Sequence, residues 1–177
     1  MNEIDDEIEI FDDPVKQTNK SSLPVFLIIL LVLSSLNVVL GTLPLISSLF
    51  QDIEVQHQAL DEVVASQEEV FSSIQEMPPS ILEEMKEFFN AKKENIRFEN
   101  NVTLLIYLLE GYGLFLMYRL RKKGFWVYLI SQFSFFILFA AVYPGYNLLT
   151  TAVFSITAFT LLLFGIAYWT QSKYMIN

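Results

Sequence analysis

The chain has 177 residues with a formal net charge of −9, and 53% of its residues are hydrophobic. This composition is too apolar for a typical soluble domain of this size. The absence of cysteine excludes disulfides and zinc–thiolate sites. The basic residues form no patch away from the apolar segments, which argues against a nucleic-acid-binding protein. Apolar and polar residues do not alternate over ten-residue stretches, which excludes a transmembrane β-barrel, so the composition indicates a helical membrane protein.

Residues 1–22 form an acidic segment with few apolar side chains, and we expect a disordered tail. Its acidity argues against a cleavable signal peptide, whose first region is basic. Ile4, Ile8 and Phe11 are spaced by four and three residues, so a short helix would present them together to a basic partner. The alternative is a solvated tail that binds no partner.

Four segments are apolar and close to the length of about 20 residues that a membrane-spanning helix needs. Only one of them contains a charged residue. We therefore expect an all-α fold, a four-helix transmembrane bundle. The expected spans are residues 23–50, 102–118, 125–143 and 148–169.

The loop at residues 119–124 gives the expected orientation. Short loops rich in Lys and Arg remain in the cytoplasm, so we expect residues 1–22 and 170–177 to be cytoplasmic as well. Alternation of the spans then places residues 51–101 and the turn at residues 144–147 outside the cell membrane. The same cluster could also bind anionic lipid headgroups. Its basic residues are Arg119, Arg121, Lys122 and Lys123.

The segment between the first two spans has the pattern of a helical hairpin. Apolar residues recur at steps of three and four over residues 53–77, which is typical of an amphipathic helix. The Pro78–Pro79 pair ends this helix, and Ser80 with Glu83 has the spacing of a capping box that opens a second one. We expect an external antiparallel hairpin in which each helix runs on from a membrane span.

Two features of the expected hairpin have functional interpretations. Phe88 and Phe89 are adjacent, so one of them could contact a partner protein or the membrane surface. The alternative is a self-contained hairpin with a solvated acidic outer face. His57 shares a helix face with Glu54 and Asp61, but such faces are common on acidic helices. We expect a solvated histidine here rather than a metal site.

Glu110 is the only charged residue inside the expected spans. At about 1.5 Å per residue it lies near the middle of its span, where a charge is costly and often functional. The other spans have polar residues at similar depth, and inward-facing polar groups in a bundle would gather in one layer. This expected polar layer consists of Glu110, Asn37, Gln132, Ser134 and Thr157.

The polar layer has two interpretations. In the first, Glu110 hydrogen-bonds neighbouring helices and ties the bundle together. In the second, Glu110 belongs to a proton or cation path. The sequence lacks the paired interrupted helices of many transporters, which favours the structural interpretation.

Two segments of the chain resemble known sequences. Residues 117–132, MYRLRKKGFWVYLISQ, and residues 23–27, LPVFL, are similar to span borders of small, uncharacterised multi-pass proteins of Bacteroidota. That group has no assigned activity. The resemblance therefore implies only a bacterial inner membrane.

The sequence contains no catalytic or cofactor-binding motif, and we expect neither an enzyme nor a bound cofactor or metal. The leading hypothesis is a non-enzymatic accessory or scaffold protein. Its hairpin or acidic tail would bind another envelope protein, or the chain would associate with itself as a homo-oligomer. The alternative is a proton- or ion-linked transporter or channel component centred on Glu110.

Overall fold

The computed structural model describes residues 23–72, 78–143, 145 and 148–176. The described residues form five α-helices and no β-strand, which confirms the expected all-α class. The expectations for Ile4, Ile8 and Phe11 lie outside the described residues, as do those for most of the turn at residues 144–147. The helices are α1 (Val25–Leu49), α2 (Ile53–Ser72), α3 (Pro79–Tyr118), α4 (Lys122–Val142) and α5 (Leu148–Gln171), followed by a 3₁₀ turn, η1 (Ser172–Tyr174).

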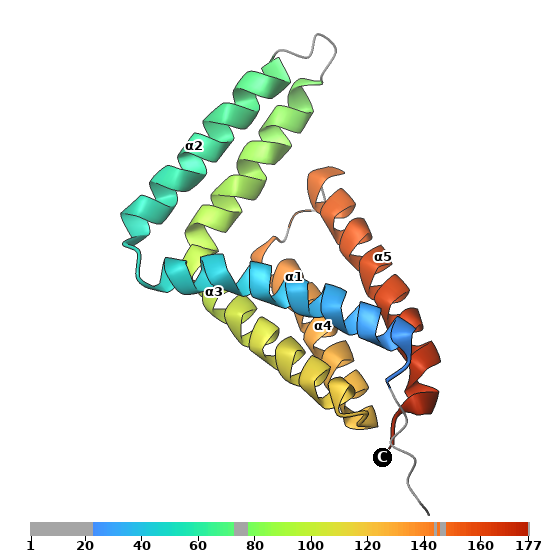
Figure 1. The fold of residues 1–177 in the computed structure, drawn as a ribbon. Helices are drawn as coiled ribbons and strands as arrows, with labels where there is room; N and C mark the ends of the chain where they lie inside the picture. The colour runs from blue at the N-terminus through green and yellow to red at the C-terminus, as the bar shows by residue number, and fades with distance from the viewer. Residues whose placement is uncertain (1–22, 73–77, 144, 146–147, 177) are drawn as a thin grey trace, which may run out of the picture.

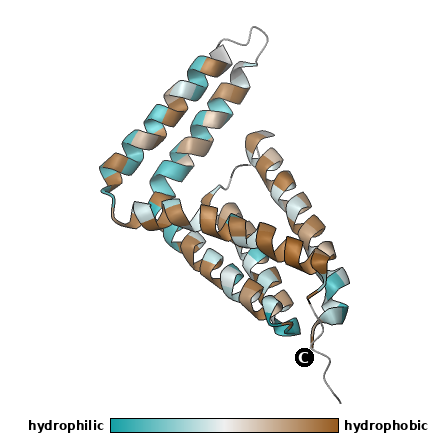
Figure 2. Ribbon diagram, viewed as in Figure 1, coloured by the Kyte–Doolittle hydropathy of each residue, from teal (hydrophilic) through white to brown (hydrophobic). Residues whose placement is uncertain are grey.

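Four of these helices have the length and apolar composition needed to cross a membrane: α1, α3, α4 and α5. Figure 2 shows the contrast between them and the hairpin, because α1 is mostly hydrophobic whereas α2 alternates between hydrophilic and hydrophobic residues. Large apolar side chains are exposed along α1 and α5, for example Leu40 and Phe159, which are 61% and 67% exposed. Such surfaces are compatible with lipid contact.

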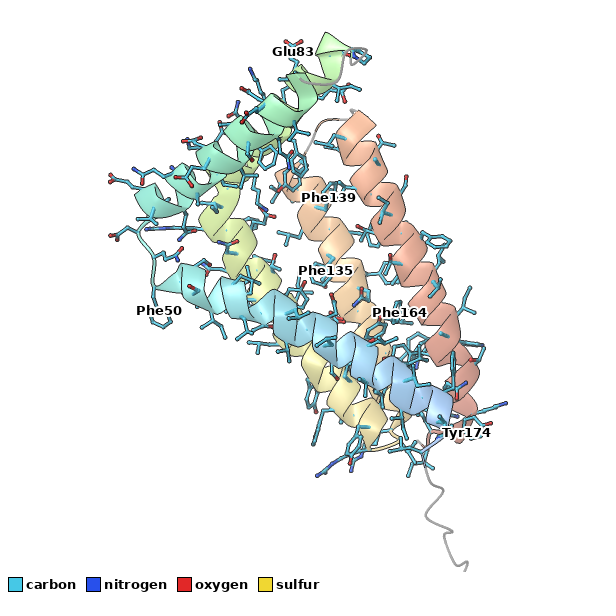
Figure 3. The ribbon with its side chains drawn as sticks, turned by 45° about the horizontal axis from the view of Figure 1, so that its top comes forward. Phe50, Glu83, Phe135, Phe139, Phe164 and Tyr174 are labelled. Atoms are coloured by element: carbon cyan, nitrogen blue, oxygen red, sulfur yellow. The ribbon has the colours of Figure 1, made fainter. Side chains whose placement is uncertain are left out.

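The first expected continuity, between the first span and the hairpin, is wrong. α1 ends at Leu49, and the chain turns before α2 begins at Ile53. The amides of Phe50 and Gln51 donate to carbonyls three residues earlier, at 3.2 and 3.3 Å, which tightens the last turn and ends the helix. Phe50 itself is 86% exposed, and Figure 3 shows its position at this turn.

The second expected continuity is present, because α3 runs for 40 residues without interruption, about 60 Å at 1.5 Å per residue. Its first part lies antiparallel beside α2, and its second part lies beside α4 (Figure 1). The helix begins at Pro79, with Pro78 as its N-cap and no side-chain cap. The expected capping box is therefore wrong, because Ser80 lies inside the helix rather than at its N-cap. A proline at the first helical position has no N–H that would need a capping partner.

α3 is the central helix, because it contacts each of the other four α-helices. Its contact with α4 is close enough to require glycine on both sides. A Cβ added at Gly124 would lie 2.6 Å from both the Gly113 carbonyl oxygen and the Met117 amide nitrogen. A Cβ added at Gly113 would lie 2.8 Å from the Tyr128 amide nitrogen. Small residues at such contacts let helix backbones approach closely in membranes.

The turn between α3 and α4 is a Schellman motif with leucine at the usual glycine position. The amides of Leu120 and Arg121 donate to the carbonyls of Met117 and Leu116, at 2.8 and 2.9 Å. Leu120 has a φ of 57°, which costs a non-glycine residue about 1 kcal/mol. Its half-buried side chain packs against the apolar core, and this contact offsets the strain.

The last described residues fold back onto the same turn. The amide of Ile176 donates to the Leu120 carbonyl at 2.6 Å, and the Lys122 amide donates to the Ile176 carbonyl at 2.9 Å. Leu23, the first described residue, packs against the same apolar cluster as Leu120. The start of α1, the α3–α4 turn and the C-terminal residues therefore lie at one end of the molecule, as Figure 1 shows.

Candidate functional site

Glu110 on α3 is buried, with 2% of its surface exposed. The side chain of Gln132, on α4, lies near its carboxyl group. The second carboxyl oxygen, Oε2, has no hydrogen-bond partner among the described residues. An acidic group buried with an unsatisfied oxygen is expensive, so this position is the strongest candidate for an intramembrane polar site.

Three tyrosines, on α3, α4 and α5, lie within electrostatic range of Glu110. They are Tyr107, Tyr128 and Tyr168. Tyr168 donates to the Ser34 hydroxyl at 2.9 Å, and its ring lies edge-on to that of Tyr128 with centroids 5.0 Å apart. We call this group the tyrosine–Glu110 cluster, and it takes residues from all four apolar helices. Its members are Ser34, Tyr107, Glu110, Tyr128, Gln132 and Tyr168.

The tyrosine–Glu110 cluster differs from the polar layer expected from sequence. Glu110 and Gln132 are together, but Asn37 is exposed on α1. Ser134 and Thr157 are half-buried, and each donates to a carbonyl of its own helix at 2.9 Å, which is the usual way such hydroxyls are satisfied inside helices. The polar residues of the four spans lie at similar depth in the sequence, but depth does not determine which face of a helix a side chain occupies.

Tyr107 was expected on the helix face of Glu110, whereas Tyr128 and Tyr168 were expected only at the membrane border. Tyr128 and Tyr168 are only 3% and 0% exposed, although their positions near helix ends are typical of residues at the membrane surface. A signal was present in the spacing: Tyr107 precedes Glu110 by three residues, and Tyr128 precedes Gln132 by four. These steps place each pair on one face of its helix.

A second polar network fixes the junction of α1, α2 and α3. The buried side-chain amide of Gln56 donates to the carbonyls of Ser48 and Gln51, at 2.8 and 3.2 Å. Asn100, on α3, donates to the Ser48 hydroxyl at 3.1 Å and to the Gln56 amide oxygen at 3.3 Å. We call this the elbow network, and it holds α2 in a defined direction relative to α1.

The hairpin is also attached to the end of α4. The ring of Phe88 stacks on that of Tyr143, with centroids 4.4 Å apart and an interplanar angle of 8°. The Tyr143 hydroxyl donates to the Glu99 carboxylate at 3.1 Å, and Lys92 donates to the same carboxylate at 3.0 Å. Phe88 is therefore engaged within the chain rather than displayed for a partner.

Phe89 faces the other way, toward α2. It is half-buried and lines a cavity of about 220 Å³ between α2 and α3, together with Leu60 and Val64. Both rings that sequence analysis proposed for partner contact thus lie in internal contacts. Ion pairs close the edges of the same interface, with Lys86 3.0 Å from Glu68 and Lys93 2.7 Å from Asp61.

His57 is half-buried rather than solvated, since its Nε2 lies 3.2 Å from the Lys93 carbonyl oxygen. Among the described residues, no group of His, Cys, Asp and Glu side chains is arranged to hold a metal ion. His57 therefore contributes to the contact between α2 and α3.

The exposed side of α2 has an apolar stripe of its own. The stripe recurs at steps of three and four, so its members share one helix face. Val55, Val63 and Val70 are 50%, 42% and 60% exposed. Ala59 and Ser66, on the same face, are also exposed. We call this face the outer stripe: Val55, Ala59, Val63, Ser66 and Val70.

The basic residues of the α3–α4 turn are exposed, and the described part of the chain provides none of them with an ion pair. One has an aromatic neighbour, since the Arg119 guanidinium lies 4.8 Å from the centre of the Phe115 ring. We call this set the basic turn: Arg119, Arg121, Lys122 and Lys123.

Together the described helices and their apolar surfaces indicate a multi-pass membrane protein. No protein-family model, curated protein or solved structure matches the chain.

Proposed function

We propose that this membrane protein is a non-enzymatic accessory component of a bacterial inner membrane, and that the outer stripe of α2 binds another envelope protein. In this proposal α2 and the adjoining part of α3 lie outside the cell. The basic turn and both termini lie in the cytoplasm, as expected from the retention of Lys and Arg on that side. Support for the orientation comes from the packing of Leu23 and Leu120 in one cluster at the same end.

The outer stripe carries the proposal. It is apolar, contains small residues, and is exposed along a helix whose opposite face already packs on α3. Helical partners recognise such faces through anchors spaced by three, four and seven residues. Small side chains within the stripe would let a partner helix approach closely.

The negative charge of α2 indicates which kind of helix would bind it. The helix contains five acidic residues and neither Lys nor Arg. A second copy of α2 would bring acidic residues against acidic residues, and like charges across an interface cost several kcal/mol. The proposed partner is therefore an amphipathic helix with basic residues beside its apolar face, rather than a second copy of this chain.

The contacts that fix the hairpin to the other helices support a binding role. The elbow network fixes the start of α2, and the contact between Phe88 and Tyr143 attaches α3 to the end of α4. A surface held in this way loses less conformational freedom on binding than a flexible one, so more of the contact energy is available for affinity.

Site-specific photocrosslinking in cells tests the proposal. A photoreactive residue at Val63, on the outer stripe, should yield an adduct with a second protein whose external segment has Lys or Arg beside an apolar face. Ala59→Glu should abolish this adduct, because it adds a charge in the middle of the stripe. High salt should weaken it in membranes by screening the charges.

The matched control is a photoreactive residue at Glu87, which is exposed on α3 of the same hairpin. We expect no comparable adduct there. Equal labelling at the two positions, or an adduct with a second copy of this chain, would contradict the proposed interface.

A second candidate function, a proton or cation path, has one specific observation in its favour: the unpartnered Oε2 of the buried Glu110. Under the accessory proposal, Glu110→Gln should keep a polar side chain beside Gln132 and leave both stability and complex formation unchanged. Glu110→Leu should lower stability by about 1 kcal/mol, the usual size of a hydrogen bond between membrane helices.

Thermal unfolding in mild detergent, together with the Val63 crosslink, measures both outcomes for the two Glu110 variants. If Glu110→Gln folds normally but fails to support the protein's role in cells, ionisation of Glu110 is required. The proton or cation path would then replace the structural role of this residue.

A further inference from the structure

The basic turn is a fixed positive surface that forms no ion pair with the described residues. The Schellman motif at Leu120 and the hydrogen bonds of Ile176 hold its backbone in place. Its side chains are exposed, and Lys173 adds a further exposed positive charge on the adjoining 3₁₀ turn. No described acidic side chain pairs with this surface, so it is available to an acidic partner from outside the described residues.

The chain itself supplies an acidic segment at this place. Residues 1–22 contain seven acidic residues against two lysines. They continue directly into Leu23, which packs against the same apolar cluster as Leu120 of the basic turn. The point where this segment joins the described chain therefore lies close to the positive surface.

We propose that the acidic segment at residues 3–13 binds the basic turn of the same chain. Asp13 lies ten positions before Leu23 in the chain, and a stretch of this length reaches up to about 33 Å. Tethering over such a distance corresponds to an effective concentration in the millimolar range. Opposite charges at that concentration associate even when each contact is weak.

The apolar residues of the acidic segment have a complementary surface as well. Tyr118 and Trp126 flank the basic turn and are 62% and 57% exposed. Ile4, Ile8 and Phe11 would meet these rings if the segment lay across the turn. An anionic lipid headgroup offers the charge without this apolar contact, and the observations therefore favour the chain's own tail.

Distance measurements between two spin labels test the proposal on the full chain, which has no native cysteine. One label is attached at Asp6→Cys and the other at Thr170→Cys, an exposed position near the basic turn. We expect a short-distance population in vesicles of phosphatidylcholine. We expect the same population in vesicles that also contain phosphatidylglycerol.

Removing charge from the tail should eliminate the short-distance population without affecting insertion, because acidic residues contribute little to membrane orientation. The tail variant combines Asp5→Asn, Glu7→Gln, Glu9→Gln, Asp12→Asn and Asp13→Asn. A matched control removes the same number of acidic charges from the hairpin and should leave the distances unchanged. It combines Asp52→Asn, Glu54→Gln, Glu62→Gln, Glu69→Gln and Glu83→Gln.

Three results would overturn the proposal. The first is a broad distance distribution in phosphatidylcholine vesicles, and the second is a short-distance population that persists in the tail variant. The third is loss of the short-distance population when phosphatidylglycerol is added, which would identify the basic turn as a lipid-headgroup site. None of these results depends on whether the outer stripe of α2 binds a partner.

Discussion

Gly124→Ala is expected to separate α3 from α4 and to destabilise the protein by about 3 kcal/mol, the upper range for overpacking a close contact. The added Cβ would lie 2.6 Å from the Gly113 carbonyl oxygen and 2.6 Å from the Met117 amide nitrogen. Both atoms belong to the backbone of α3, so no side chain can rotate away to make room. The helices themselves must move apart.

Gly165→Ala, on α5, is the matched control. Its added Cβ would have Leu129 Cδ2 as its nearest neighbour at 3.8 Å, which is an ordinary contact, and alanine also favours the helix. We expect a change of less than about 0.5 kcal/mol, typical of substitutions away from tight contacts. Thermal unfolding in detergent compares the two variants. Similar melting temperatures for both would show that α3 and α4 are not in close backbone contact at Gly124.

The Gly124 contact illustrates what the sequence could not reveal. Length and hydropathy predict the four apolar helices, because a membrane imposes both requirements on every span. They contain no information about which helices are neighbours. Gly113 and Gly124 identify the closest pair only when the two positions are known to face each other.

The hairpin shows a similar limit. Periodicity predicted two helices around the proline pair, and both are present. It also placed the apolar residues of α2 on one face, whereas Leu60 and Val64 face α3 and Val63 and Val70 are exposed. When a helix has apolar residues on two sides, their spacing alone does not show which side packs inside the hairpin and which is exposed.

The candidate polar site was predicted in part for the same reason. A carboxylic acid in the middle of an apolar segment is visible in any sequence, and Glu110 is buried in the structure. Its neighbours depend on how α1 crosses the other helices. Ser34 falls on the buried side of α1 and Asn37 does not, a distinction that requires the packing itself.

Tyr168→Ala is expected to have the largest effect of any single change at the tyrosine–Glu110 cluster. Tyr168 is 0% exposed, contacts Tyr128 edge-on, and donates to Ser34 of α1. Removing the side chain would leave a cavity where α1, α4 and α5 meet and would cost about 3–5 kcal/mol, as for other large-to-alanine changes in packed interiors.

Two neighbouring variants separate the causes of that loss. Tyr168→Phe keeps the ring and removes only the hydrogen bond to Ser34, so it should cost about 1 kcal/mol. Trp169→Ala removes a larger side chain that is 62% exposed, and we expect it to cost less than Tyr168→Ala because little packed volume is lost. Unfolding in detergent ranks the three variants. If Trp169→Ala were as destabilising as Tyr168→Ala, the burial of Tyr168 would not explain how α5 is held to the other helices. A contact of Trp169 with a partner or with the membrane would then account for the loss of stability.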